Sequence, residues 1–270
     1  REQADRGDRV VRLHLATTPK CSRKLFFHKT TFYVITKMIQ LIGLLAISWL
    51  LIWLFEKGDL SVLGLTPTKD RLKYFAVLFF VSAILAATAF LLRMYFVKEE
   101  YTISQPLTAG SILLESWYQF RSVFTEELLC RGALLYILIK KIGQTKAVIV
   151  SALFFAVLHW LNAGVLGDPI QMTMVFAFTF AMGLLLAYSF ARTFSLLIPF
   201  AIHFGWNLTQ NYIFPDTATG NHIFILASPP PIVTISYLAF FTMLLFPKIS
   251  VLVINYLLVK QYPQVKVPQG

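Results

Sequence analysis

Apolar residues in this chain gather in runs of about 20, and short polar stretches separate them. A helix of about that length crosses a hydrocarbon core of ~30 Å. The runs predict membrane-length helices at residues 33–55, 72–97, 147–161, 170–190 and 194–214. Two more apolar segments, at residues 231–246 and 250–259, predict one further span and a short segment behind it.

Residues 107–141 show a different pattern, with apolar side chains at helical spacing and polar ones on the other faces. We interpret them as an amphipathic helix that leads into a buried one. With this segment the count reaches seven or eight spans. The predicted fold class is therefore all-α, a polytopic membrane helix bundle with a polar intramembrane cavity.

Composition agrees with a membrane protein, because 57% of the residues are hydrophobic and only 14% are charged. A soluble domain has about a quarter charged residues. The net charge of +11 is concentrated near the start, where residues 1–31 hold eight Lys or Arg and three acids. We predict a basic cytosolic leader at 1–31 that contacts anionic lipid, no nucleic-acid partner, and one membrane domain at 32–262.

Few ionisable residues lie inside the apolar stretches, and this scarcity points to a function for those that do. Glu126 and Glu127 are adjacent, so on a helix they point about 100° apart and cannot share one role. Arg131 follows Glu127 by four residues, on the same face, which predicts a buried ion pair. Glu126 then faces another environment, where a carboxylate can act as a general base.

Three further polar residues come from the later spans. His159 ends an apolar run, and His203 and Asn207 are four apart, on one face of their helix. Pro199 lies one turn before His203, and a kink there could open a cavity. We expect Glu126 and His159 to polarise a water molecule, and His203 and Asn207 to stabilise an oxyanion. This set suffices for amide hydrolysis without a covalent nucleophile.

Other chemistries stay open at this point. Glu126, His159 and His203 could bind a metal ion, although no H-E-x-x-H motif occurs. Cys130 shares a helix face with Glu126 and could form a thiol protease with His159. Intramembrane Glu and His also build proton relays in transporters, and the same cluster could pack a non-catalytic scaffold that binds a membrane partner.

The polar residues form three ordered motifs, Glu126-Glu127-x-x-x-Arg131, Phe155-x-x-x-His159 and His203-x-x-x-Asn207. At these motifs the chain resembles the CAAX protease and bacteriocin-processing enzymes, a family of intramembrane glutamate proteases that includes the Ras-converting CAAX endopeptidase. The resemblance covers about residues 107–214.

The resemblance implies catalysis by Glu126 and His159, an oxyanion hole of His203 and Asn207, and structural support from Glu127 and Arg131. It implies a peptide or protein substrate at the membrane, with a prenylated C-terminus, a bacteriocin or a signalling peptide as the known classes. It implies no cofactor and no metal, and a helical bundle whose cavity opens to the cytosol and membrane.

Overall fold

The computed structural model describes residues 20–105, 107–214 and 222–267. The chain divides into two compact units, Arg1–Leu44 and Leu45–Gly270. The first unit is described only from Lys20, where a helix begins inside the predicted leader, and residues 1–19 of that leader lie outside the described part. All of the site discussed below belongs to the second unit.

The predicted all-α class is confirmed, apart from two three-residue strands that pair antiparallel with Tyr101 opposite Leu226. In chain order the described elements are α2 (Lys20–Glu56), η1 (Leu60–Leu63), α3 (Lys69–Phe96), β1 (Tyr101–Ile103), α4 (Ala109–Arg131), α5 (Ala133–Ile142), α6 (Gln144–Leu158), η2 (His159–Leu161), α7 (Pro169–Thr193), α8 (Leu197–Leu208), the π-helical turn η3 (Thr209–Ile213), β2 (Phe224–Leu226) and α9 (Tyr237–Gln261).

Within the described residues, five helices are long and apolar enough to cross a membrane, which makes the chain a multi-pass membrane protein. They lie at Met38–Glu56, Lys69–Phe96, Gln144–Leu161, Pro169–Thr193 and Tyr237–Gln261. The predicted count of seven or eight is not reached. Helices α5 and α8 are only 10 and 12 residues long, and α4 carries five charged side chains in its 23 residues.

Residues 107–141 form two successive helices, as the pattern predicted, and Gly132, with a ψ of −132°, ends α4 and starts α5. Two other local predictions are wrong. Residues 237–261 form one helix that continues through Pro247, which membrane helices tolerate where neighbouring groups satisfy the freed backbone. Pro199 lies in the first turn of α8, where a proline needs no kink.

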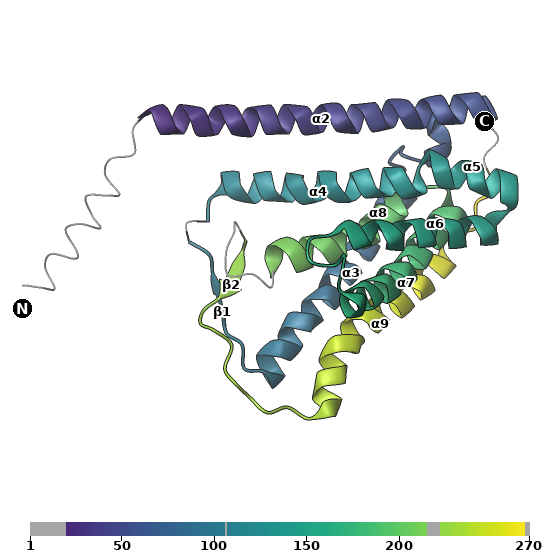
Figure 1. The fold of residues 1–270 in the computed structure, drawn as a ribbon. Coiled ribbons are helices and arrows are strands. Elements are labelled where there is room, and N and C mark those ends of the chain that lie inside the picture. The colour runs from purple at the N-terminus through teal and green to yellow at the C-terminus, as the bar shows by residue number, and fades with distance from the viewer. Residues whose placement is uncertain (1–19, 106, 215–221, 268–270) are drawn as a thin grey trace, which may run out of the picture. The chain divides into compact units, whose positions relative to one another are not determined.

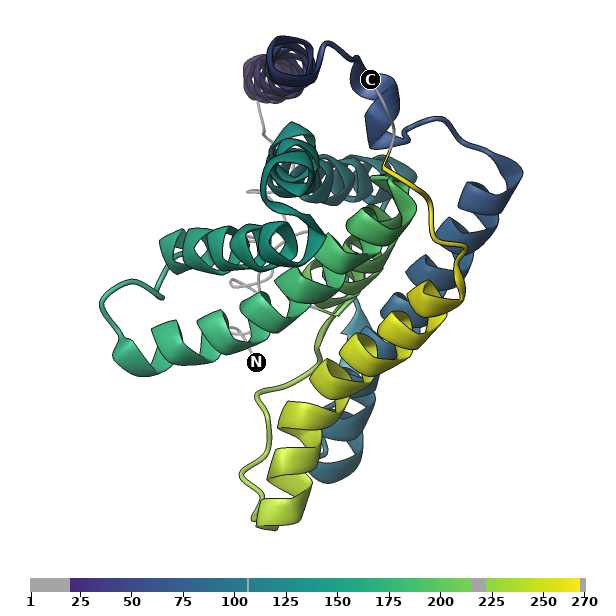
Figure 2. The same ribbon diagram turned by 90° about the vertical axis from the view of Figure 1, so that its right-hand side faces the viewer.

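Helix α8 occupies the centre of the second unit, where it packs against α3, α4 and α7 (Figure 1). Helices α3 and α9 lie side by side along one flank, and α6 and α7 pair on another (Figure 2). Gly205 explains the close approach of α8 to α3, because a Cβ at this position would overlap the carbonyl oxygen of Phe79. A glycine midway between His203 and Asn207 therefore lets α8 lie directly on α3.

The start of α8 is held by the turn after η1. The Leu196 amide donates to the Leu63 carbonyl at 2.8 Å, and the Ser195 hydroxyl donates to the Gly64 carbonyl at 2.9 Å. Gly64 has a φ of 58°, and a side chain there would collide with the Phe194 carbonyl. These contacts fix where α8 begins, and hence where His203 and Asn207 lie along it.

Candidate active site

Helix α4 brings three of the predicted residues to one place. It starts at a capping box, in which the Thr108 hydroxyl accepts from the Ser111 amide at 3.1 Å and the Ser111 hydroxyl accepts from the Thr108 amide at 3.0 Å. Its last two turns carry Glu126, Glu127 and Arg131. Arg131 stands in the final turn, where the negative end of the helix dipole favours a cation.

Glu127 is sealed inside the protein with two partners. Its side chain is 0% exposed, as is that of Arg131, whose Nη1 lies 3.0 Å from Glu127 Oε1. His203 donates from Nδ1 to the same oxygen at 2.7 Å. The contact expected from the four-residue spacing of Glu127 and Arg131 is thus present, and a histidine from α8 extends it.

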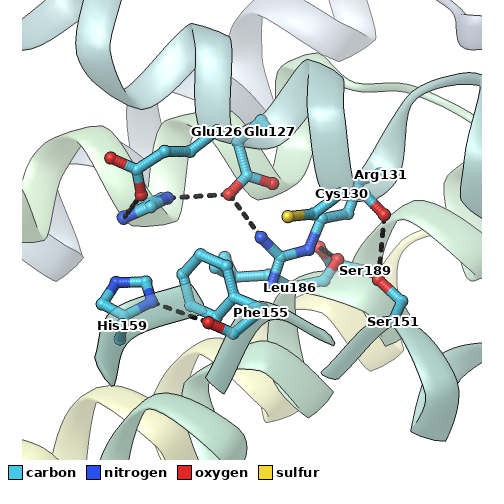
Figure 3. Close-up of polar contacts among 10 residues, drawn as sticks. Glu126, Glu127, Cys130, Arg131, Ser151, Phe155, His159, Leu186 and Ser189 are labelled. Atoms are coloured by element: carbon cyan, nitrogen blue, oxygen red, sulfur yellow. Dashed lines mark hydrogen bonds and ion pairs between the residues drawn. The ribbon is translucent and has the colours of Figure 1, made fainter. Parts of the chain in front are cut away.

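Glu126 has a different environment, although it is the neighbouring residue. Its side chain is 36% exposed, and its Oε2 lies 3.8 Å from His203 Nε2, beyond hydrogen-bond reach. Figure 3 shows the two glutamates leaving the same turn of α4 in different directions. Glu126 lines a pocket of about 520 Å³, to which His159 and Asn207 also contribute.

His159 enters this pocket from the end of α6. Its Nδ1 lies 2.7 Å from the Phe155 carbonyl oxygen, which can only accept, so Nδ1 carries the hydrogen. In the neutral ring Nε2 then keeps its lone pair. His159 therefore offers the pocket a hydrogen-bond acceptor and proton acceptor, fixed by the backbone one turn earlier.

Asn207 and His203 line a second, adjoining pocket of about 210 Å³, together with His159. All six predicted residues thus meet in one cluster built from α4, α6 with η2, and α8. Four carry polar groups to the pockets, and the Glu127–Arg131 pair lies behind them.

Sequence reasoning missed several residues that line these pockets. Asn162 and Asn211 line both of them, and Gln119 and Ser122 line the larger one. Asn211 follows Asn207 by four residues, so helical spacing alone could have indicated it. Asn162 has no such signal, because it lies in the turn after η2 and reaches the pocket through tertiary structure.

Cys130 also borders the larger pocket, but its environment is that of a core residue. It is 1% exposed, and burial raises the pKa of its thiol to about 12. A reactive cysteine is instead partly exposed and has a lowered pKa. The thiol chemistry considered from sequence finds no support in this position.

The arrangement of the donor side chains bears on the metal-binding alternative. No group of three or more His, Cys, Asp or Glu side chains within the described residues has the arrangement that could hold a metal ion. His203 Nδ1 is committed to a hydrogen bond with Glu127.

Comparison with known proteins gives one match. Residues 107–209 match the family model described as type II CAAX prenyl endopeptidase Rce1-like. No curated protein and no solved structure matches the chain. The matched segment contains Glu126, Glu127, Arg131, His159 and the pair on α8. Within residues 107–209 the chain is therefore similar to the Rce1-like type II CAAX prenyl endopeptidases.

Proposed function

We propose that the chain is an intramembrane endopeptidase that hydrolyses a peptide bond of a membrane-associated protein or peptide. One observation carries the proposal: Glu126, His159 and Asn207, from three helices, line a single pocket of about 520 Å³ in the segment that matches the family. A carboxylate, an imidazole with a free lone pair and an amide donor are the groups that water activation and oxyanion stabilisation need.

In the proposed reaction, a water molecule between Glu126 and His159 attacks the scissile carbonyl carbon. Glu126 takes a proton from that water as the new C–O bond forms. The carbonyl oxygen becomes an oxyanion, which the Asn207 amide stabilises. The carbon–nitrogen bond then breaks, and the proton held by Glu126 passes to the leaving amine.

His203 contributes to the oxyanion site only if it carries a hydrogen on Nε2. Because Nδ1 already donates to Glu127 at 2.7 Å, donation from Nε2 requires the doubly protonated ring. The Glu127 carboxylate stabilises such a cation, and Arg131 holds that carboxylate in place at 3.0 Å. The Glu127–Arg131 pair therefore supports the reaction by fixing the direction of the His203 ring.

The test is cleavage of a fluorogenic prenylated C-terminal peptide, and of a mixed peptide library, by the detergent-purified full chain. Wild type is compared with Glu126→Gln and with Glu100→Gln, an exposed glutamate outside the pocket. Cleavage by wild type and Glu100→Gln but not by Glu126→Gln, in the presence of a chelator, supports the proposal.

Other outcomes point elsewhere. Loss of cleavage on chelation assigns the same residues to a metal-dependent protease. If wild type cleaves no substrate, and cells that carry Glu126→Gln behave like cells that carry the wild-type chain, the chain acts as a membrane scaffold or regulator instead.

A further inference from the structure

The ring of Phe155 contacts three ionisable side chains of the candidate site. Its centroid lies 4.0 Å from the Arg131 guanidinium carbon, 4.3 Å from the His159 ring centre and 5.6 Å from the His203 ring centre. Phe155 itself is 2% exposed. One buried aromatic ring from α6 therefore meets groups from α4, η2 and α8.

We propose that Phe155 is a positioning residue, which holds Arg131, His159 and His203 in register through its ring face, its edge and its backbone carbonyl. The inference rests on the proposed function, because the groups it positions are those assigned to water activation and oxyanion stabilisation. Phe155 itself takes no proton, and its role is exerted through its three neighbours.

Arg131 gives the first argument. It is fully buried and donates to Glu127, while its Nε and Nη2 have no hydrogen-bond partner within the described residues. A buried cation with unused donors needs other compensation. The negative face of an aromatic ring 4.0 Å away supplies it. Phe155 thus keeps the guanidinium over its ring, with Nη1 directed at Glu127.

His159 gives the second argument, since Phe155 fixes it twice. The Phe155 carbonyl accepts from Nδ1 at 2.7 Å, which selects the tautomer, and the two rings meet at an angle of 61°. In Figure 3 the His159 ring and the Phe155 side chain lie beneath the two glutamates of α4. The lone pair on Nε2 is thereby held in one direction.

His203 gives the third argument. Its Nδ1 is anchored on Glu127, but one hydrogen bond leaves the imidazole free to tilt about that contact. The Phe155 ring meets it at 86°, an edge-to-face packing that restricts this tilt. The position of Nε2, which faces Glu126, therefore depends on Phe155.

The test compares Phe155→Leu, which keeps an apolar side chain but removes the ring, with Phe155→Tyr, which restores the ring. Phe190→Leu is the matched control, since Phe190 is a buried ring of α7 at 0% exposure that packs on Phe194. We expect Phe155→Leu to lower kcat for the fluorogenic prenylated peptide at least tenfold with KM within twofold. Phe155→Tyr should recover most of the loss, and Phe190→Leu should keep the wild-type kcat.

A second readout does not need catalysis. Nitrogen-15 spectra of the histidine-labelled full chain, assigned with His159→Gln and His203→Gln, report the tautomer and hydrogen bonding of each ring. Phe155→Leu should shift the resonances of both histidines, and Phe190→Leu should leave them in place. If Phe155→Leu changes neither kcat nor these resonances beyond the control, the inference is overturned. If wild type cleaves nothing, the proposed function fails, while the spectra still decide the positioning role.

Discussion

Glu126 and Glu127 are chemically identical neighbours, and they occupy opposite halves of the polar cluster. Glu127 is 0% exposed and is held by Arg131 and His203, whereas the Glu126 side chain is 36% exposed and lines a pocket. Glu127 is held between two buried side chains, which suits a structural role. A change in its charge would leave other buried charges uncompensated. A carboxylate beside open volume can meet a substrate.

The difference arises from the helix itself. Successive residues on α4 point about 100° apart, so only one of two adjacent glutamates can point toward Arg131, four residues after Glu127. The other is turned toward the pocket. The geometry of the helix therefore places one glutamate in a buried contact and its neighbour beside the pocket. Substitutions around the buried glutamate should lower stability, whereas substitutions at the pocket should lower turnover.

The sharpest test of this comparison is Glu126→Gln. We expect turnover to fall by about 10²- to 10⁴-fold, the range that a positioned general base contributes, with thermal stability unchanged. Peptide cleavage and thermal unfolding are measured on the same preparation, with Glu100→Gln as the control. If Glu126→Gln unfolds at a lower temperature than wild type, then Glu126 also stabilises the fold, and the two glutamates do not have separate roles.

For the buried pair of Glu127 and Arg131, the main effect of substitution is expected on stability. Arg131→Met should lower the free energy of unfolding by about 3–5 kcal/mol, because it leaves the buried Glu127 carboxylate without its cation. Adding Glu127→Gln to Arg131→Met should restore part of this loss, since the two residues share one contact. Denaturant unfolding in detergent measures both variants.

Arg121→Met serves as the control for the sealed pair, because Arg121 lies on the same helix and is only partly buried. Its unfolding free energy should stay within about 1 kcal/mol of wild type. If Arg131→Met unfolds no more easily than this control, then the Glu127–Arg131 pair contributes no stability. The two glutamates would then not be divided into a stabilising and a catalytic residue.

A smaller effect is expected at Asn207, on the open side. Asn207→Leu should lower kcat about 10²- to 10³-fold, the loss seen when one oxyanion donor is removed. Asn211→Leu provides the comparison, since Asn211 lines the same pockets one turn later. We expect its loss to be under tenfold. Equal losses would assign the asparagines to substrate binding in common, and not to the oxyanion.

Much of this arrangement could be predicted from spacing. The four-residue interval of Glu127 and Arg131 indicated their contact, and the adjacency of the two glutamates indicated separate environments. Apolar runs located the membrane helices to within a few residues, as for α3 and α7. Each of these features depends on one helix alone, which is why the sequence contains it.

Individual side-chain contacts between two helices were not predicted. His203 joins Glu127 only because α8 packs against α4, and the Arg131–Phe155 contact needs α4 to meet α6. The position of the break at Gly132 was not predicted, because an isolated glycine is compatible with a helix and its backbone angles depend on context. Pro199 was expected to kink a helix that in fact begins only two residues earlier, at Leu197.

The smallest effect is expected at Cys130, which shares a face of α4 with Glu126 and borders the larger pocket, but is buried like Glu127. Its thiol is 1% exposed, and burial raises its pKa to about 12, so almost none of it is thiolate near neutral pH. Cys130→Ala should therefore keep kcat within about threefold of wild type, with a stability cost of about 1 kcal/mol for the small volume removed. Treatment of wild type with a thiol-alkylating reagent should likewise leave peptide cleavage intact.

A hundredfold loss in Cys130→Ala, with wild-type thermal unfolding, would instead place the nucleophile on the sulfur and reduce Glu126 to a neighbour of the reacting group. Retained activity would leave Glu126 as the reacting group that α4 brings to the pocket.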